Sequence, residues 1–185
     1  MVAQGWCRHH AVGDTGNVPI GGAAPGLTYR EIGATTWSQL PRGYHHQQRV
    51  QRIGVGQDQF VAAVQRLTSW DMHRRAGVRI DVDFPVFLDQ LAVLRLQLGP
   101  LEIAAPVRVV YLVDEPRERG FAYGTLDSHP EIGEERFTVR IDGDDVVWAE
   151  IRAFSRPGRW FTRLGGPLAR RVQAVMTQRY LDALG

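Results

Sequence analysis

The stretch Gly120–Phe137 reads GFAYGTLDSHPEIGEERF and places strand-forming residues on both sides of a Ser-His-Pro turn signal. Apolar and polar residues that alternate over a few positions are typical of a half-buried strand, and clusters of Gly, Pro, Asp and Ser are typical of turns. We therefore predict strands over Gly120–Leu126 and Glu134–Ile141. The short connection between them predicts an antiparallel pair.

The same kind of pattern continues on both sides of this pair. Apolar residues alternate with charged ones from Val78 to Phe84, and Pro85 ends the alternation. Gly-Pro, Asp-Glu-Pro and Asp-Gly-Asp turn signals separate the segments that follow. The further predicted strands are Leu27–Ile32, Val50–Ile53, Val78–Phe84, Gln90–Leu98, Val107–Val113 and Val146–Phe154. Consecutive strands joined by short turns form an antiparallel meander.

Two segments instead repeat apolar residues at the helical period. One helix is predicted over Asp58–Arg75, and another segment runs from Pro157 to the C-terminus, with a break at Gly165–Pro167 into a short and a long helix. A half-apolar sheet and an amphipathic helix bury their apolar faces against each other. We therefore predict an α+β helix-grip fold, in which a curved antiparallel β-sheet wraps around a long C-terminal helix.

The chain of 185 residues has the length of one domain. Residues 1–26 are rich in Gly, Ala and Pro without periodicity, so we predict a flexible N-terminal extension over 1–26 and one domain over 27–185. Cys7 is the single cysteine, which excludes an internal disulfide and favours a cytoplasmic location. The sequence has no continuous apolar run of about 20 residues, so we expect no integral membrane segment.

The formal net charge is +2, and all the basic side chains are arginines. This small charge and the lack of a nucleic-acid-binding motif argue against a nucleic-acid partner. Acidic residues dominate from Asp127 to Glu150, and arginines dominate from Arg152 onward. We interpret the C-terminal arginines as a solvated helix face, with a phosphate-, membrane- or protein-binding face as the alternative.

Six short strings resemble one known family in their order along the chain. They are LTY at 27–29, LPRGY at 40–44, GFAYGTL at 120–126, HPE at 129–131, GEE at 133–135 and FSRP at 154–157. Together they resemble the family of domains of unknown function numbered nineteen-ninety, over about Leu27–Leu184. The order of elements is also similar to the START or Bet v 1-like superfamily. That resemblance implies binding of a lipid, hormone or polyketide and, in some members, cyclisation or dehydration without a cofactor.

Glu135 and His129 are the candidate proton-transfer residues. In a strand over Glu134–Ile141, Glu135 lies on the same side as Phe137 and points inward, whereas Glu134 points to the other side. A carboxyl group among apolar side chains holds its proton more tightly and serves as a general acid or base near neutral pH. We expect a cavity between the curved sheet and the terminal helix. His129, in the turn, projects over the mouth of that cavity. The alternatives are a Glu135 that reaches water at a frayed strand end and a His129 that is exposed and idle.

Tyr123 is the third candidate catalytic residue, because its hydroxyl is suited to hold a developing enolate. The predicted ligand-binding residues are Trp70, Tyr111, Thr125, Glu131, Trp148 and Arg152. Glu131 extends the polar rim of the turn, and an inward Arg152 binds an anionic or carbonyl oxygen. The alternatives are a core position for Trp70 and a surface network between Arg152 and Glu150.

We expect no metal and no cofactor. The His9–His10 and His45–His46 pairs lack a spacing that converges on a metal ion, and no Cys or carboxylate set completes a coordination sphere. Gly54 and Gly56 precede a helix but lack the third glycine of a dinucleotide-binding turn. Ser155 lies outside any Gly-x-Ser-x-Gly elbow, which argues against a hydrolase triad.

These features predict a protein that binds an apolar or polyketide-like small molecule in its cavity. As an enzyme it would be a cofactor-free cyclase, dehydratase or isomerase. The alternative is a noncatalytic carrier or sensor of a lipid or metabolite. A third hypothesis is a protein-interaction module that uses the arginine-rich terminal helix, and a homodimer is compatible with each of the three.

Overall fold

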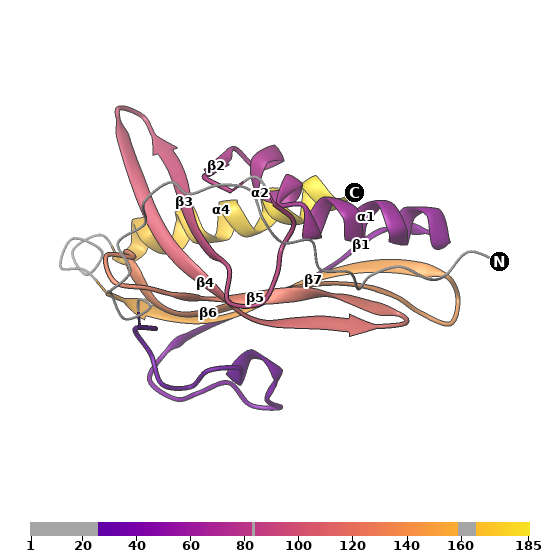
Figure 1. Cartoon of the computed structure of the whole chain (residues 1–185), viewed down its shortest axis with the longest axis horizontal. Helices are drawn as coiled ribbons and strands as arrows, with labels where there is room; N and C mark the ends of the chain where they lie inside the picture. The colour runs from indigo at the N-terminus through magenta and orange to yellow at the C-terminus, as the bar shows by residue number, and fades with distance from the viewer. Residues whose placement is uncertain (1–25, 83, 159–165) are drawn as a thin grey trace, which may run out of the picture.

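The computed structural model of the chain describes residues 26–82, 84–158 and 166–185. Its strands form one seven-stranded sheet in the order β1-β7-β6-β5-β4-β3-β2 (Figure 1). They are β1 (His45–Val55), β2 (Val78–Ile80), β3 (Leu91–Leu98), β4 (Leu101–Glu115), β5 (Glu118–Thr125), β6 (Glu131–Ile141) and β7 (Val146–Pro157). All neighbouring strands are antiparallel. Each strand from β2 to β6 pairs with the next strand along the chain, and β7 also pairs with β1. The predicted antiparallel meander is confirmed.

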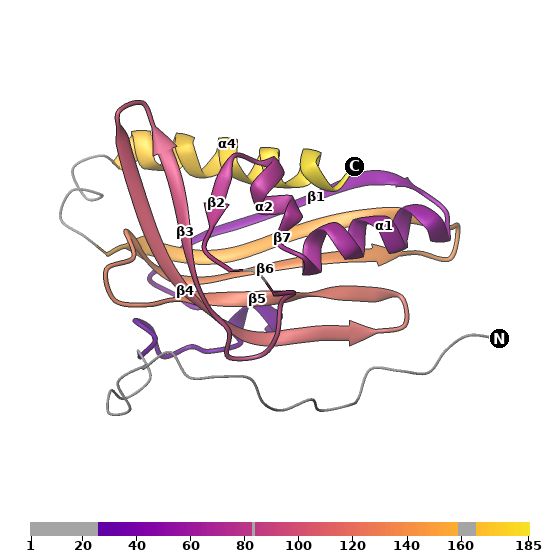
Figure 2. The ribbon, with the colours of Figure 1, turned by 45° about the horizontal axis from the view of Figure 1, so that its top comes forward.

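Among the described residues, three helices cover one face of this sheet (Figure 1 and Figure 2). They are α1 (Gln57–Thr68), α2 (Asp71–Arg75) and α4 (Gly166–Leu184). Phe121, Phe137 and Ile151 of the sheet are fully buried in one core with Leu181 of α4. Each such side chain contributes about 1.5–3 kcal/mol by leaving water. The predicted helix-grip fold, with a curved antiparallel sheet and a long C-terminal helix, is therefore confirmed.

The single helix predicted over Asp58–Arg75 is wrong, because the chain breaks at Trp70. This residue has a left-handed backbone with φ 64° between α1 and α2. Such a conformation costs about 1–3 kcal/mol in a residue other than glycine. The Trp70 indole is fully buried, packs at an angle against Phe121 and donates a hydrogen bond to Gln90 Oε1 at 3.3 Å. Burial of this large ring therefore outweighs the local backbone strain.

The strand predicted over Leu27–Ile32 is also wrong. Leu27 forms an isolated bridge with Leu126, and the chain then leaves the sheet. Residues 27–44, which we call the N-terminal strap, instead cross the outer face of the sheet, opposite the helices (Figure 1). The strap contains a short 3-10 helix, η1 (Ala34–Thr36).

Two predictions fall on residues that the structure does not describe. The extension predicted over 1–26 lies outside the described residues except for Gly26, and so does the short helix predicted after Pro157. Among the helices that are described, none is both long enough and apolar enough to cross a membrane.

A buried carboxylate on β6 fastens the strap to the sheet. Glu134 is 2% exposed and accepts hydrogen bonds from the Tyr29 hydroxyl at 2.7 Å and the Gly33 N–H at 2.7 Å. It also accepts from the Thr35 N–H at 3.0 Å and the Thr35 hydroxyl at 2.5 Å. Hydrogen bonds to charged groups contribute about 1.5–3 kcal/mol each. Tyr29 adds an edge-on ring contact with Phe154 at 5.6 Å between centroids, so polar and apolar contacts hold the same segment.

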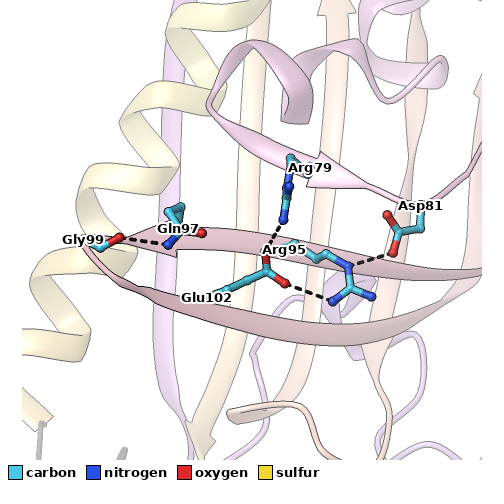
Figure 3. A network of polar contacts seen from close by, with 6 residues as sticks. All are labelled: Arg79, Asp81, Arg95, Gln97, Gly99 and Glu102. Atoms are coloured by element: carbon cyan, nitrogen blue, oxygen red, sulfur yellow. Dashed lines mark hydrogen bonds and ion pairs between the residues drawn. The ribbon is translucent and has the colours of Figure 1, made fainter.

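A network of ion pairs joins the strands at the opposite end of the sheet order (Figure 3). Arg79 on β2 lies directly opposite Arg95 on β3, and Glu102 on β4 bonds both guanidinium groups. Arg95 also donates to Asp81 at 2.8 Å. Exposed ion pairs contribute less than about 1 kcal/mol each. The shared carboxylate nevertheless offsets the repulsion between two arginines that face each other across a strand pair.

Replacement of Glu134 by glutamine is expected to loosen the strap. A glutamine amide has one acceptor oxygen and turns an NH₂ group toward buried donors, so some of those donors lose their partner. We expect the free energy of unfolding to fall by about 2–4 kcal/mol in urea denaturation. The matched control is Glu31→Gln in the strap, where a half-exposed carboxylate accepts a hydrogen bond from the Tyr44 hydroxyl at 3.0 Å. Equal losses in the two variants would contradict the anchoring role.

Candidate functional site

A small polar cavity lies where β5, β6 and β7 approach α4. It has a volume of about 50 Å³. Its lining residues are Tyr123, Thr125, His129, Glu131, Gly133, Glu134, Glu135, Ala153, Phe154, Ser155 and Gln173. Pockets that enclose a whole drug-sized ligand have volumes of about 300–1,000 Å³. The cavity is therefore much too small for a whole ligand of that size and has room for water or for one end of a ligand.

Glu135 and Tyr123 form the central polar pair of the cavity. They lie directly opposite each other on β6 and β5, and the Tyr123 hydroxyl donates to Glu135 Oε2 at 2.9 Å. Burial raises the pKa of Glu135 to about 7, while the Tyr123 hydrogen bond lowers it and the nearby Glu131 raises it further. Burial also raises the pKa of Tyr123 well above its usual value, so the hydroxyl keeps its proton and acts as a donor. Glu135 thus exchanges a proton readily near neutral pH.

Glu131, Ser155 and Gln173 form a second polar group on the cavity wall. Gln173 of α4 donates from Nε2 to the Ser155 hydroxyl at 3.2 Å, and the same nitrogen lies 3.5 Å from Glu131 Oε2. Burial raises the pKa of Glu131, and a hydrogen bond with Ser155 lowers it in part. These contacts tie the terminal helix to the carboxylates of the sheet.

The His129 ring contacts the backbone of Glu131, two residues further along the turn. His129 Nδ1 lies 2.9 Å from both the backbone nitrogen and the backbone oxygen of Glu131. Burial lowers the pKa of His129 to about 4, and the imidazole is therefore neutral and weakly basic near pH 7. This arrangement favours Glu135 over His129 as the proton-transfer group.

The remaining predicted site residues lie outside this cavity. Trp70 is in the core behind Tyr123, with the two rings nearly parallel and 6.3 Å apart. Tyr111 bonds the Thr35 hydroxyl of the strap at 2.6 Å. The roles predicted for these two residues and for Trp148 and Arg152 in ligand binding remain predictions.

Trp148 and Arg152 belong to the outer face of the sheet. Trp148 donates to Asp142 Oδ2 at 2.8 Å and lies 5.4 Å from the Arg140 guanidinium carbon. Arg152 donates to the backbone oxygen of Thr35 at 3.3 Å. Thus the cavity brings together five of the predicted residues, and the outer face holds three others. The five in the cavity are Tyr123, Thr125, His129, Glu131 and Glu135.

Sequence reasoning missed several polar residues around the site. It placed Glu134 correctly on the outer side of β6 but did not anticipate the strap that buries it. Gln173 gave no local signal, since its role depends on how α4 is placed. His73 is also fully buried, and burial lowers its pKa to about 3. Neither of its ring nitrogens has a hydrogen-bond partner.

The described residues contain no group of three or more His, Cys, Asp or Glu side chains arranged to hold a metal ion. The cavity instead offers carboxyl, hydroxyl and amide groups from β5, β6, β7 and α4. Such a set can donate and accept hydrogen bonds and can move a proton.

Comparison of the sequence with known families gives a match over most of the chain. Residues 28–183 match the family described as domain of unknown function (DUF1990). A UPF0548 protein of Deinococcus radiodurans is 44% identical over 77 residues, which cover 42% of this chain and 39% of that protein. A UPF0548 protein of Arabidopsis thaliana is 29% identical over 139 residues, which cover 71% of this chain and 67% of that protein. With the Deinococcus protein, the match therefore spans less than half of the relative's length.

Solved structures share the fold at low sequence identity. A hypothetical protein of Helicobacter pylori has a TM-score of 0.58 at 10% identity, with 88% of this chain and 96% of that chain covered. A point mutant of norcoclaurine synthase from Thalictrum flavum, solved with a transition-state analogue, has a TM-score of 0.50 at 10% identity, with 78% and 97% covered. These likenesses bear on the fold, and the match over residues 28–183 bears on the family. This chain belongs to the DUF1990 family and has the Bet v 1-like helix-grip fold.

Proposed function

We propose that this protein is a cytoplasmic, cofactor-free enzyme that moves a proton on an apolar or polyketide-like small molecule, as in an isomerisation, dehydration or cyclisation. The observation that carries the proposal is the Glu135–Tyr123 pair in the cavity, with its hydrogen bond of 2.9 Å. A carboxyl group with a pKa of about 7 is present in both protonation states near neutral pH. Such a group is suited to accept a proton in one step and return it in another.

Glu135 acts as the base and Tyr123 as the oxygen-binding group. The ionised Glu135 takes a proton from a carbon next to a substrate carbonyl. The electron pair of that C–H bond forms a carbon–carbon double bond, and the π electrons of the carbonyl move onto its oxygen to give an enolate. Tyr123 has one hydroxyl proton, which is donated to Glu135 in the ligand-free cavity. Once Glu135 is protonated, its own O–H donates to the Tyr123 oxygen, and the tyrosine proton turns toward the enolate. Return of the proton to another atom completes the isomerisation or begins dehydration.

The size of the cavity limits which part of the substrate enters it. A volume of about 50 Å³ accommodates a carbonyl or hydroxyl group with its adjoining carbon. The rest of a polyketide-like molecule extends beyond these residues. Thr125 and Ser155 supply further hydroxyl groups on the wall for the same end of the ligand.

The effect of Tyr123 on the pKa of Glu135 is testable without a substrate. In the wild type, the Glu135 carboxyl is half ionised near pH 7. We expect Tyr123→Phe to raise this pKa, because the variant loses the hydroxyl that stabilises the carboxylate. Glu131→Gln is expected to lower it, because the variant loses a neighbouring negative charge. Carbon-13 NMR titration of the Glu135 carboxyl measures both shifts, and shifts in the same direction would contradict the pairing.

Catalysis is testable with the ligand that the protein carries. Native mass spectrometry of protein purified from its own host identifies that ligand, which is then incubated with protein in D₂O. We expect the wild type to introduce deuterium or to convert the ligand, at a rate that rises as pH increases through about 7, since the base must be ionised. Glu135→Gln is expected to slow this about 10²–10⁴-fold.

The control for this experiment is Glu150→Gln. Glu150 on β7 lies opposite Thr138 on β6 and accepts a hydrogen bond from Gln48. It is not among the residues that line the cavity. Its variant is expected to keep the wild-type rate. Full activity in Glu135→Gln would refute the catalytic role. A ligand that binds and is released unchanged by every variant, without deuterium, would identify a carrier or sensor instead.

A further inference from the structure

Two arginines face each other on the outer face of the sheet. Arg136 on β6 lies directly opposite Arg152 on β7. Because side chains alternate along a strand, Arg136 points away from the face that Glu135 occupies. Arg136 and Arg152 both lie close enough to Tyr111 to influence its pKa, which places the three side chains in one cluster. Like charges at directly opposed positions repel, so this pairing costs stability unless an anion lies between them.

Polar atoms in this cluster are buried without a partner. Arg136 Nε and Arg152 Nε are both inaccessible to solvent and have no hydrogen-bond partner. The Thr138 hydroxyl, two residues along β6 on the same face, is also unpartnered in a side chain that is 1% exposed. An unpaired buried donor is destabilising, and more so when it is charged. The two Nε–H groups can only donate and therefore lack an acceptor, and the Thr138 hydroxyl is able to donate to the same acceptor.

The existing contacts leave the Nε–H groups of both arginines without an acceptor. Arg136 donates from Nη2 to Glu118 at 2.6 Å. Arg152 donates to the backbone oxygens of Thr35 and Ser38, both at 3.3 Å, and these acceptors carry no formal charge. The nearby Glu134 already accepts four hydrogen bonds from the strap.

The same chain shows how such an arginine pair is neutralised elsewhere. Arg79 and Arg95 also face each other across a strand pair, and the carboxylate of Glu102 bonds both (Figure 3). Within the described part of the chain, no carboxylate forms an ion pair of 4.0 Å or less with both Arg136 and Arg152. The outer-face pair thus has the geometry of the first pair without its shared oxyanion.

We propose that Arg136 and Arg152 form an oxyanion-binding site on the outer face of the sheet, with the Thr138 hydroxyl as an additional donor. The ligand is a carboxylate or a phosphate group, because planar guanidinium groups bond two oxygens of such anions at once. The site is separate from the Glu135 cavity, which opens on the other side of β6. It gives this protein a second binding site that is independent of the proposed catalysis.

The test is titration of the full-length protein with inorganic phosphate and, separately, with acetate. Nitrogen-15 NMR of the arginine Nε–Hε groups follows the binding. We expect the Arg136 and Arg152 signals to shift and saturate with at least one of the two anions. Saturation with phosphate alone identifies a phosphoryl ligand, and saturation with acetate alone identifies a carboxylate. Saturation with neither anion would overturn the proposal, whatever the behaviour of the variants.

Variants assign the binding to these side chains. Arg136→Gln and Arg152→Gln are each expected to weaken anion binding at least about tenfold, since a charge-assisted hydrogen bond of about 1.5 kcal/mol or more is lost. The matched control is Arg79→Gln, which also removes an arginine that bonds a single glutamate and faces a second arginine. It is expected to bind as the wild type does. Undiminished binding in Arg136→Gln and Arg152→Gln would refute the assignment.

Discussion

The alternation of side chains along β6 is the constraint on which the rest of the structure depends. Neighbouring residues of a strand point to opposite faces, so Glu134 and Glu135 lie in opposite surroundings. Glu134 meets four donors from the strap, and all of them bond its two oxygens. Glu135 meets one donor, Tyr123, in the cavity. The two adjacent carboxyl groups therefore lie in different environments: Glu134 fastens the strap, and burial raises the pKa of Glu135 to about 7.

The register of the strands determines both which residues meet in the cavity and which residues meet on the outer face. Pairing of β6 with β5 sets Glu135 against Tyr123, and pairing of β6 with β7 sets Arg136 against Arg152. A slip of one residue would move each of these side chains to the other face. The apolar core, which requires Phe137 to face the helices, therefore also determines which polar groups meet on each side.

The sequence predicts those parts that depend on local periodicity. Alternation along the strands gave the meander and placed Glu135 on the inner side, opposite Glu134. It did not predict the break at Trp70, because a buried indole there outweighs the helical pattern of its neighbours. Nor did it predict the strap, since the hydrogen bonds from Tyr29 and Thr35 to Glu134 span 105 and 99 residues of sequence. No local pattern reports contacts of that separation.

Aromatic rings fill part of the space between the sheet and the helices. The predicted helix-grip fold implied a cavity there, yet His73 lies in that space against Tyr180 at 4.8 Å and Phe137 at 5.2 Å between ring centroids. Trp70 and Phe121 pack against the same imidazole. The cavity of about 50 Å³ lies beside this cluster, where Glu135 faces polar groups. Under the proposed function, a ligand therefore inserts its reacting group rather than its whole body. Selectivity then depends more on hydrogen bonding at that group than on the shape of the remaining molecule.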